Sequence, residues 1–234
     1  MRVTSLSLAT AGAALLAPAV LPVPATAVPP PQRPAASRDK HEVTAADLLA
    51  RAHACTQPSR GRFRTDADSP ATIRVCGNRD IVFWKADLDI DCDGRPTARC
   101  NRGTDPLFAA TTAFQQADGR QLNAERLPYI VVPAPSKRWN PRTSGVRGGS
   151  VAAVIYRDRV QYAIVGDTGP RDLIGEASYA TARALGIRAN PINGGVASGV
   201  TYIVFRNSRI RPIESRKEAT EVGRRLARHF IEKD

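Results

Sequence analysis

The chain has 234 residues, of which 34 are Lys or Arg and 22 are Asp or Glu, and its formal net charge is +12. This length allows one domain with a sizeable core. A positive charge favours anionic partners in general. However, the arginines are spread along the chain, no nucleic-acid-binding motif is present, and aromatic residues make up only 6%. We therefore predict no nucleic-acid partner and interpret most arginines as solvated surface charge.

The N-terminal residues 1–27 have the features of a secretory signal peptide. Arg2 is followed by an Ala/Leu-rich apolar run and then by Ala25-Thr26-Ala27, a plausible cleavage site. The run is short and broken by prolines, and no later run is long enough to span a bilayer, so we predict no membrane partner. Residues 28–41 are Pro-rich and polar, as in a leader or linker. We predict a secreted, extracellular monomer with one domain at 42–234.

Four cysteines lie in the first half of this domain, and an even number in an exported protein favours disulfides. Three pairings are possible. We predict Cys92–Cys100, which closes a short loop, and therefore Cys55–Cys76. A zinc site is the alternative, but the sequence has no C-x-x-C motif and its histidines are not grouped with the cysteines.

The apolar pattern predicts a mainly β domain with helices near its start, between the fifth and sixth strands, and at its end. Strict strand–helix alternation, which would indicate a doubly wound parallel sheet, is absent. A small β-barrel with peripheral helices therefore fits best. The expected strands are 71–76, 80–94 (ending in an acidic turn), 128–134, 150–156, 160–166 and 199–205, and the expected helices are 44–54, 174–186 and 215–233.

The acidic run "DLDIDCDG" (87–94) places a carboxylate at every second position. Its Asp89, Asp91 and Asp93 match the opening of a calcium loop, but Cys100 stands where the twelfth position requires a bidentate glutamate. The alternative is an edge strand that presents Asp87, Asp89, Asp91 and Asp93 on its outward face. Such carboxylates repel one another unless a cation meets them, so we expect a cationic ligand here. We predict no bound metal, although a cation in the loop remains open.

The stretch "GDTGPRDLIGEAS" (166–178) contains two carboxylates nine residues apart, Asp167 and Glu176. The apolar run before Asp167 predicts a strand that ends there, followed by a turn, with Glu176 at the start of a helix. One interpretation is structural, because aspartates stabilise turns and glutamates favour helix N-termini. The other is that both face one cleft, as glycoside hydrolysis requires: one carboxylic acid protonates the leaving oxygen and one carboxylate acts on the opposite face.

Four segments together resemble the fungal and actinobacterial endo-chitosanases of glycoside hydrolase family 75. They are "ADLDIDCDG", "LPYIVVP", "YAIVGDTGPRDLIGEASYATARALGI" and "GVTYIVF", and the resemblance runs from about residue 81 to residue 205. It implies a six-stranded barrel of double-psi type and hydrolysis of β-1,4-linked glucosamine chains, with inversion at the anomeric carbon and without a cofactor. The two essential carboxylates of the family match Asp167 and Glu176.

The resemblance leaves roles to be assigned. We predict Glu176 as general acid and Asp167 as the base that activates water. A helix N-terminus would lower the pKa of Glu176, which is the wrong direction for an acid, so the reverse assignment stays open. Because chitosan is a polycation and the chain is basic, we expect the carboxylates to line one cleft away from the arginines. The predicted substrate-binding residues are Asp87, Asp89, Asp91, Asp93, Asp172 and Trp139. The alternative function is a non-catalytic barrel that binds a polysaccharide or the cell wall.

Overall fold

The computed structural model describes residues 42–233. The predicted signal peptide (1–27) and Pro-rich leader (28–41) lie outside the described residues, and so does the last residue of the predicted domain. Within 42–233, no helix combines the length and apolar character needed to cross a bilayer.

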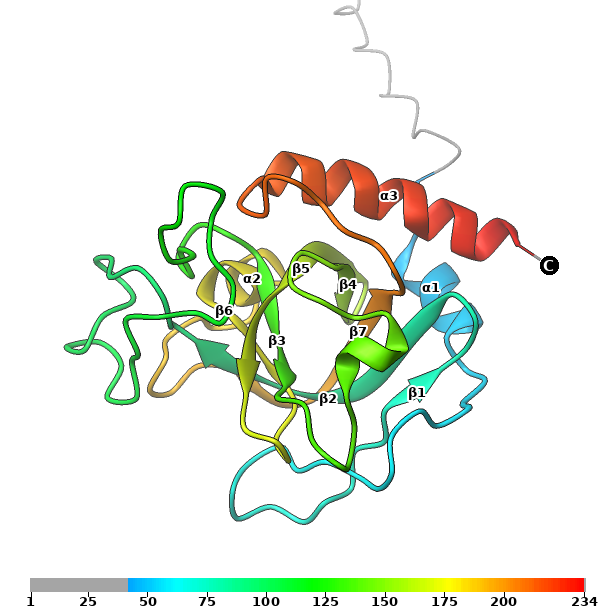
Figure 1. Cartoon of the computed structure of the whole chain (residues 1–234), viewed down its shortest axis with the longest axis horizontal. Coiled ribbons are helices and arrows are strands. Elements are labelled where there is room, and N and C mark those ends of the chain that lie inside the picture. The colour runs from blue at the N-terminus through cyan, green and yellow to red at the C-terminus, as the bar shows by residue number, and fades with distance from the viewer. Residues whose placement is uncertain (1–41, 234) are drawn as a thin grey trace, which may run out of the picture. The chain divides into compact units, whose positions relative to one another are not determined.

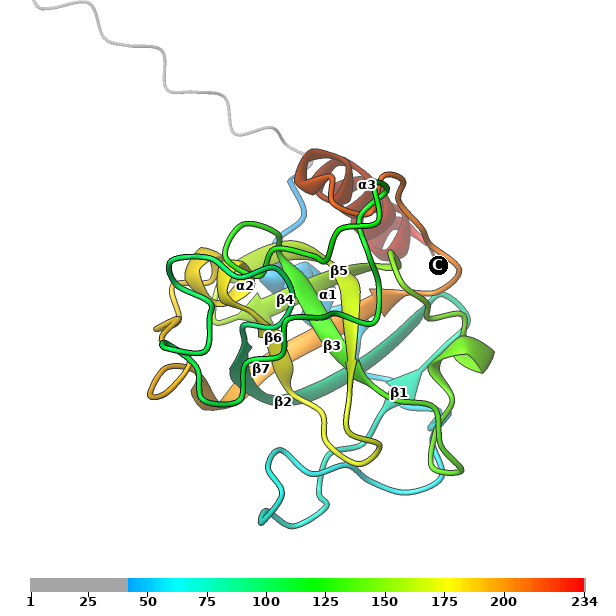
Figure 2. The same cartoon turned by 60° about the vertical axis from the view of Figure 1, so that its left-hand side comes forward.

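Six strands form a closed barrel, which confirms the predicted mainly β fold with peripheral helices (Figures 1 and 2). The β2–β6 and β3–β5 pairs are parallel and the others are antiparallel, and β7 closes the barrel by pairing with β2. The short strand β1 (Cys76–Gly77) adds to β2 outside the closed ring. In order around the barrel the strands are β2 (Ile81–Asp91), β6 (Glu176–Ser178), β3 (Tyr129–Pro133), β5 (Arg159–Gly169), β4 (Val151–Tyr156) and β7 (Val196–Phe205).

Both faces of the barrel wall are covered over much of its area, which explains the long apolar runs of its strands. On β2, Trp84 and Leu88 belong to the cluster of buried side chains inside the barrel, where Trp84 stacks on Tyr202 with ring centroids 5.3 Å apart. Alternate positions such as Phe83 belong to the outer cluster. Helix α3 (Arg216–Glu232) packs on β4 and β5, and on α1 (Ala45–Arg51), so these helices cover one side of the barrel (Figure 1).

Two of the predicted elements differ most from the structure. Residues 71–76 do not form a strand, since only Ile73 makes an isolated bridge, to Phe63, before β1 begins at Cys76. The helix predicted at 174–186 is shorter: α2 spans Tyr179–Ala184, with Ser178 as its N-cap. A one-turn 3-10 helix, η1, lies at Pro141–Ser144.

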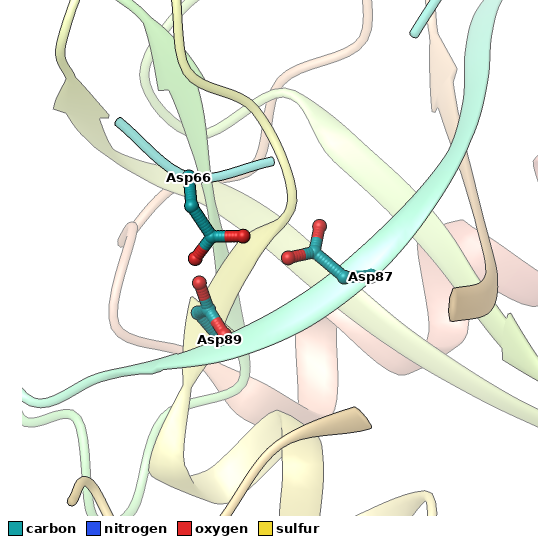
Figure 3. A group of neighbouring side chains, drawn as sticks. All are labelled: Asp66, Asp87 and Asp89. Atoms are coloured by element: carbon teal, nitrogen blue, oxygen red, sulfur yellow. The ribbon is translucent and has the colours of Figure 1, made fainter. Parts of the chain in front are cut away.

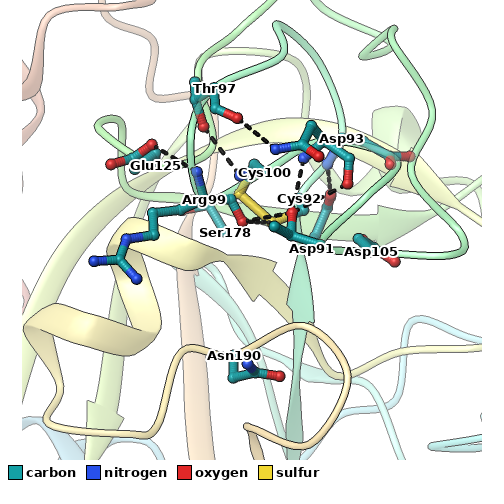
Figure 4. The surroundings of a disulfide bond; sticks show 12 residues. Asp91, Cys92, Asp93, Thr97, Arg99, Cys100, Asp105, Glu125, Ser178 and Asn190 are labelled. Atoms are coloured by element: carbon teal, nitrogen blue, oxygen red, sulfur yellow. Dashed lines mark hydrogen bonds between the residues drawn. A yellow bond between two sulfur atoms is a disulfide. The ribbon is translucent and has the colours of Figure 1, made fainter.

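The predicted disulfides are both present. Cys55–Cys76 joins the segment after α1 to β1, and Cys92–Cys100 closes a loop directly after β2. The second disulfide fixes the start of a long segment, residues 92–128, that leaves the barrel between β2 and β3 (Figure 4).

Candidate active site

A cleft of about 510 Å³ lies on the outer face of the barrel wall, and none of its lining residues belongs to α3. Its floor is formed by β2, β6, β3 and β5, and its rims are formed by residues 105–107 and 191–194. Six carboxylates line it, and its lining contains no Lys or Arg. They are Asp89, Asp91, Asp93, Asp105, Asp167 and Glu176.

A β-bulge places Asp167 in this cleft. Ile130 of β3 pairs with Val165 of β5, whereas the next residue, Val131, pairs with Asp167, so Gly166 is an extra residue in β5. In a regular strand Asp167 would share the inward face of Val165, two residues before it, because side chains alternate along a strand, and the bulge turns Asp167 to the outer face instead. Gly166 fits because a Cβ there would lie only 2.6 Å from Cβ of Tyr129. Contrary to the predicted turn at 168–170, β5 continues through Asp167 to Gly169.

Asp167 and Glu176 lie on either side of Val131 on the same face of the sheet. The antiparallel register of β3 and β6, in which Ile130 faces Ala177, brings Val131 alongside Glu176. Neighbouring strands lie about 4.8 Å apart, so the two backbones are about 9.5 Å apart across β3. The Glu176 side chain reaches over β3 toward β5, since a Cβ on Gly169 would be 2.8 Å from its Oε2. Both carboxyl groups therefore border the same floor.

Asp167 is held as an acceptor. Its Oδ1 accepts two backbone N–H groups, from Ala113 and from Thr168, each at 2.7 Å. The side chain is buried, and burial raises its pKa while these two hydrogen bonds oppose the increase. Hydrogen bonds to the ionised form favour a carboxylate, which is the form a general base requires.

Glu176 has the electrostatics of an acid. Burial, followed by the charges of Asp89, Asp93 and Asp167, raises its pKa to about 7. The prediction that Glu176 begins a helix is wrong, because it is the first residue of β6 and pairs in parallel with Asp89. The expected helix N-terminus, which would have lowered its pKa, is therefore not beside it.

The other carboxylates of the floor are also crowded. Asp91 accepts a hydrogen bond from the Tyr129 hydroxyl at 3.2 Å and from the Asp93 backbone N–H at 2.6 Å. Burial and the charges of Asp93 and Asp167 keep its pKa well above the usual range. Asp93 accepts the Ala109 N–H at 2.7 Å, and burial raises its pKa to about 6. Figure 4 shows Asp91 and Asp93 beside the Cys92–Cys100 disulfide, which links the floor to the rim segment.

Three of the predicted substrate-binding residues do not line the cleft. Asp172 is half-exposed and lies 4.0 Å from the Arg64 guanidinium. Trp139 is buried in the core, where its indole N–H donates to Ser144 Oγ at 2.9 Å, so it presents no ring face to a ligand. Asp87 lies on β2 beside the cleft and is 4% exposed. β2 pairs with β7 as far as Leu88 and with β6 over residues 89–91, so it is part of the closed barrel and not an edge strand. The predicted alternation does hold for Asp89 and Asp91, which face the cleft together.

The rims of the cleft were not predicted from the sequence. Leu107 and Ile192 are 90% and 66% exposed, and they lie on opposite rim segments. Among residues 42–233, the only other large hydrophobic side chain that is exposed is Leu49. Asp105, also missed, is buried and accepts the Leu107 N–H at 2.9 Å, which orders that rim. The segment 104–116 has no clear periodicity, so no sequence signal separated these residues from an ordinary loop.

The acidic floor coincides with the part of the chain that a known family covers. Residues 88–232 match the model of the family described as fungal chitosanase of glycosyl hydrolase group 75. The chain belongs to this family. The matched region contains β3 to β7, α2 and α3 and therefore includes both Asp167 and Glu176.

Curated endo-chitosanases from Aspergillus are similar to this chain. An endo-chitosanase of Aspergillus fumigatus is 29% identical over 151 residues, which cover 62% of this chain and 62% of that protein. Endo-chitosanase C of Aspergillus oryzae is 34% identical over 124 residues, covering 51% and 30% of the two chains. These matches therefore span less than two thirds of the relatives' own lengths. A solved Streptomyces papain inhibitor aligns at 18% identity with a TM-score of 0.33 over 53% of this chain and 94% of its own, and it carries no argument about function.

Proposed function

We propose that this protein is a secreted endo-chitosanase that hydrolyses β-1,4 linkages between glucosamine units with inversion, using Glu176 as general acid and Asp167 as general base. The observation that carries the proposal is the placement of the Asp167 and Glu176 carboxyl groups. They lie on the strands to either side of Val131, on the floor of one cleft whose only charged lining residues are acidic. Family membership and the names of the relatives support the substrate class.

The cleft suits a cationic polysaccharide despite the chain's positive net charge. Six carboxylates line it, and salt screens the distant arginines beyond about 8–10 Å. The ammonium groups of glucosamine units would form charge-assisted hydrogen bonds with these carboxylates. Leu107 and Ile192, on the two rims, offer apolar contact to the C–H faces of sugar rings. Binding would thus combine acidic recognition on the floor with apolar contacts at the edges.

The chemical step follows from the protonation states of the pair. Glu176 gives its proton to the glycosidic oxygen as the bond between that oxygen and the anomeric carbon breaks. A water on the opposite face forms the new bond to the anomeric carbon and gives a proton to Asp167. An inverting site needs about 6.5–9.5 Å between carboxyl groups to hold that water. The backbone separation across β3, about 9.5 Å, is compatible with this range once both side chains lean into the cleft.

The experiment is hydrolysis of soluble chitosan by the full chain, measured as new reducing ends and as loss of viscosity. An endo-acting enzyme lowers viscosity early, when few ends have formed. We expect activity on chitosan and little or none on the neutral polymer chitin. Polymer binding without product release would contradict the proposal and favour the non-catalytic polysaccharide-binding barrel.

A further inference from the structure

A second group of carboxylates lies next to the cleft but mostly outside it. Asp66, from the segment between α1 and β1, approaches Asp87 and Asp89 of β2, and one oxygen of each lies within 4.8 Å of the others. Figure 3 shows the three carboxylates directed toward a common point. Asp89 also lines the cleft, whereas Asp66 and Asp87 do not.

The Asp87 carboxylate provides an independent sign that a ligand belongs here. Asp87 is 4% exposed, and its Oδ1 has no hydrogen-bond partner among the described residues. None of the ion pairs found within 42–233 involves Asp66, Asp87 or Asp89, and the nearby Arg64 is paired with Asp172 instead. Leaving a buried carboxylate oxygen without a partner costs considerable free energy. A cation bound by all three groups would remove that cost.

The backbone next to Asp87 leaves room for this carboxylate. Gly175 has φ +129°, a conformation that other residues rarely adopt, and a Cβ on it would lie 1.8 Å from Asp87 Oδ1. The glycine thus lets a buried carboxylate approach the chain just before β6. A second buried group, the Tyr202 hydroxyl, donates to the backbone carbonyls of Asp87 and Gly175 at 2.8 and 3.1 Å, which fixes both segments.

We propose that Asp66, Asp87 and Asp89 bind a hard divalent cation of the Ca²⁺ type at the edge of the cleft. Such ions take six to eight oxygen ligands at about 2.3–2.6 Å, so two ligand oxygens on one ion are at most about 5 Å apart. The oxygen separations in the cluster satisfy this limit. The donors are oxygens alone, which suits Ca²⁺ rather than zinc. Asp66 and Asp89 are exposed, so water can complete the coordination.

This site differs from the one weighed in the sequence. The calcium-loop match used Asp89, Asp91 and Asp93, of which the last two face the cleft floor and accept hydrogen bonds. The proposed site instead recruits Asp66, which lies well before β2 in the chain. The ion would tie the segment between α1 and β1 to the wall of the barrel.

The test is calorimetric titration of the full-length protein, stripped with EDTA, with CaCl₂ alone, together with thermal unfolding in EDTA and in millimolar CaCl₂. We expect one site per chain and a higher Tm with CaCl₂. Asp66→Asn should weaken Ca²⁺ binding at least tenfold and remove most of the Tm shift. Asp66 is exposed, so this variant is expected to fold, and circular dichroism verifies that it does. Asp158→Asn, at an exposed carboxylate in the turn between β4 and β5, is the matched control and should bind Ca²⁺ as the wild type does.

No polysaccharide is present in this titration, so its outcome is separate from that of the chitosanase proposal. Absence of binding heat and of a Tm shift in the wild type would overturn the site. The same conclusion follows if Asp66→Asn binds Ca²⁺ as tightly as Asp158→Asn does. If Asp66→Asn raises the KM for chitosan while the wild type binds no Ca²⁺, the cluster serves the polymer's ammonium groups and the metal proposal is wrong.

Discussion

Replacing Glu176 with glutamine should remove activity and, above neutral pH, stabilise the fold. Burial and neighbouring carboxylates raise the pKa of Glu176 to about 7, against an ordinary value of 4.5. A carboxyl group whose pKa is higher in the folded state favours folding at low pH, and this contribution is lost as pH rises from about 4.5 through about 7. The difference between these two pKa values corresponds to about 3 kcal/mol in the free energy of unfolding. Partial solvent access of the side chain reduces this contribution to roughly 1–3 kcal/mol. Since the glutamine side chain carries no charge, the variant avoids the cost of ionisation.

The assay is thermal unfolding of wild type and Glu176→Gln at pH 4 and pH 8 in metal-free buffer, paired with reducing-end release from chitosan. We expect equal Tm values at pH 4 and a Tm higher by roughly 2–10 °C for the variant at pH 8. Loss of a general acid should lower kcat by about 10²–10⁴-fold. Glu232→Gln, at an exposed glutamate near the end of α3, is the control and should change neither quantity. A variant that keeps most of its activity would show that Glu176 is not the general acid, and a variant no more stable than wild type at pH 8 would show that its pKa is not raised in the fold.

Single substitutions at the base, beside the acid and on the rims test the other parts of the site. Asp167→Asn should lower kcat by at least about 10²-fold. Azide can replace water as the nucleophile without a base, so recovery of the rate with added azide would identify Asp167 as the lost base. A variant with near wild-type activity would contradict this role. Gly169→Ala should fold but lower kcat with little change in KM, because its Cβ would displace the end of Glu176, and an unchanged kcat would show that this contact is unimportant. Leu107→Ala and Ile192→Ala should raise KM several-fold without changing Tm, whereas a loss of Tm would assign these side chains to packing.

The barrel was predictable because its strands are long and apolar on both faces. Residues 81–86, 129–133 and 200–205 are runs of mostly buried, apolar side chains, so local composition indicates them well. The disulfides were predictable from spacing, since Cys92 and Cys100 are close in sequence. The strand β6 was not, because three residues carry no periodicity. Residues 176–178 form a strand only because β2 pairs with them on one side and β3 pairs with Ala177 on the other.

The site depends on features that act between distant segments. Asp167 was identified from its motif, but the face of the sheet on which its side chain lies was not. Regular alternation along β5 would turn it into the barrel, whereas the one-residue bulge at Gly166 turns it to the cleft. Trp139 lies in a Pro- and Arg-rich stretch that resembles an exposed loop, yet it packs edge-to-face against Phe63 and Trp84. Asp66 has no local signal that connects it with Asp87. Such contacts follow from how the barrel closes and from how the segments between its strands fold back on it.

The stereochemistry of the first product shows whether Glu176 and Asp167 act as the acid and base of an inverting enzyme. Proton NMR of freshly hydrolysed chitosan oligomers, recorded before mutarotation, distinguishes the α- and β-anomers of the new reducing end. Attack by water from the face opposite Glu176, with Asp167 as base, predicts the α-anomer as the initial product. An initial β-anomer would contradict it, because retention requires a carboxylate nucleophile about 5–5.5 Å from the acid instead of a water held between the two strands.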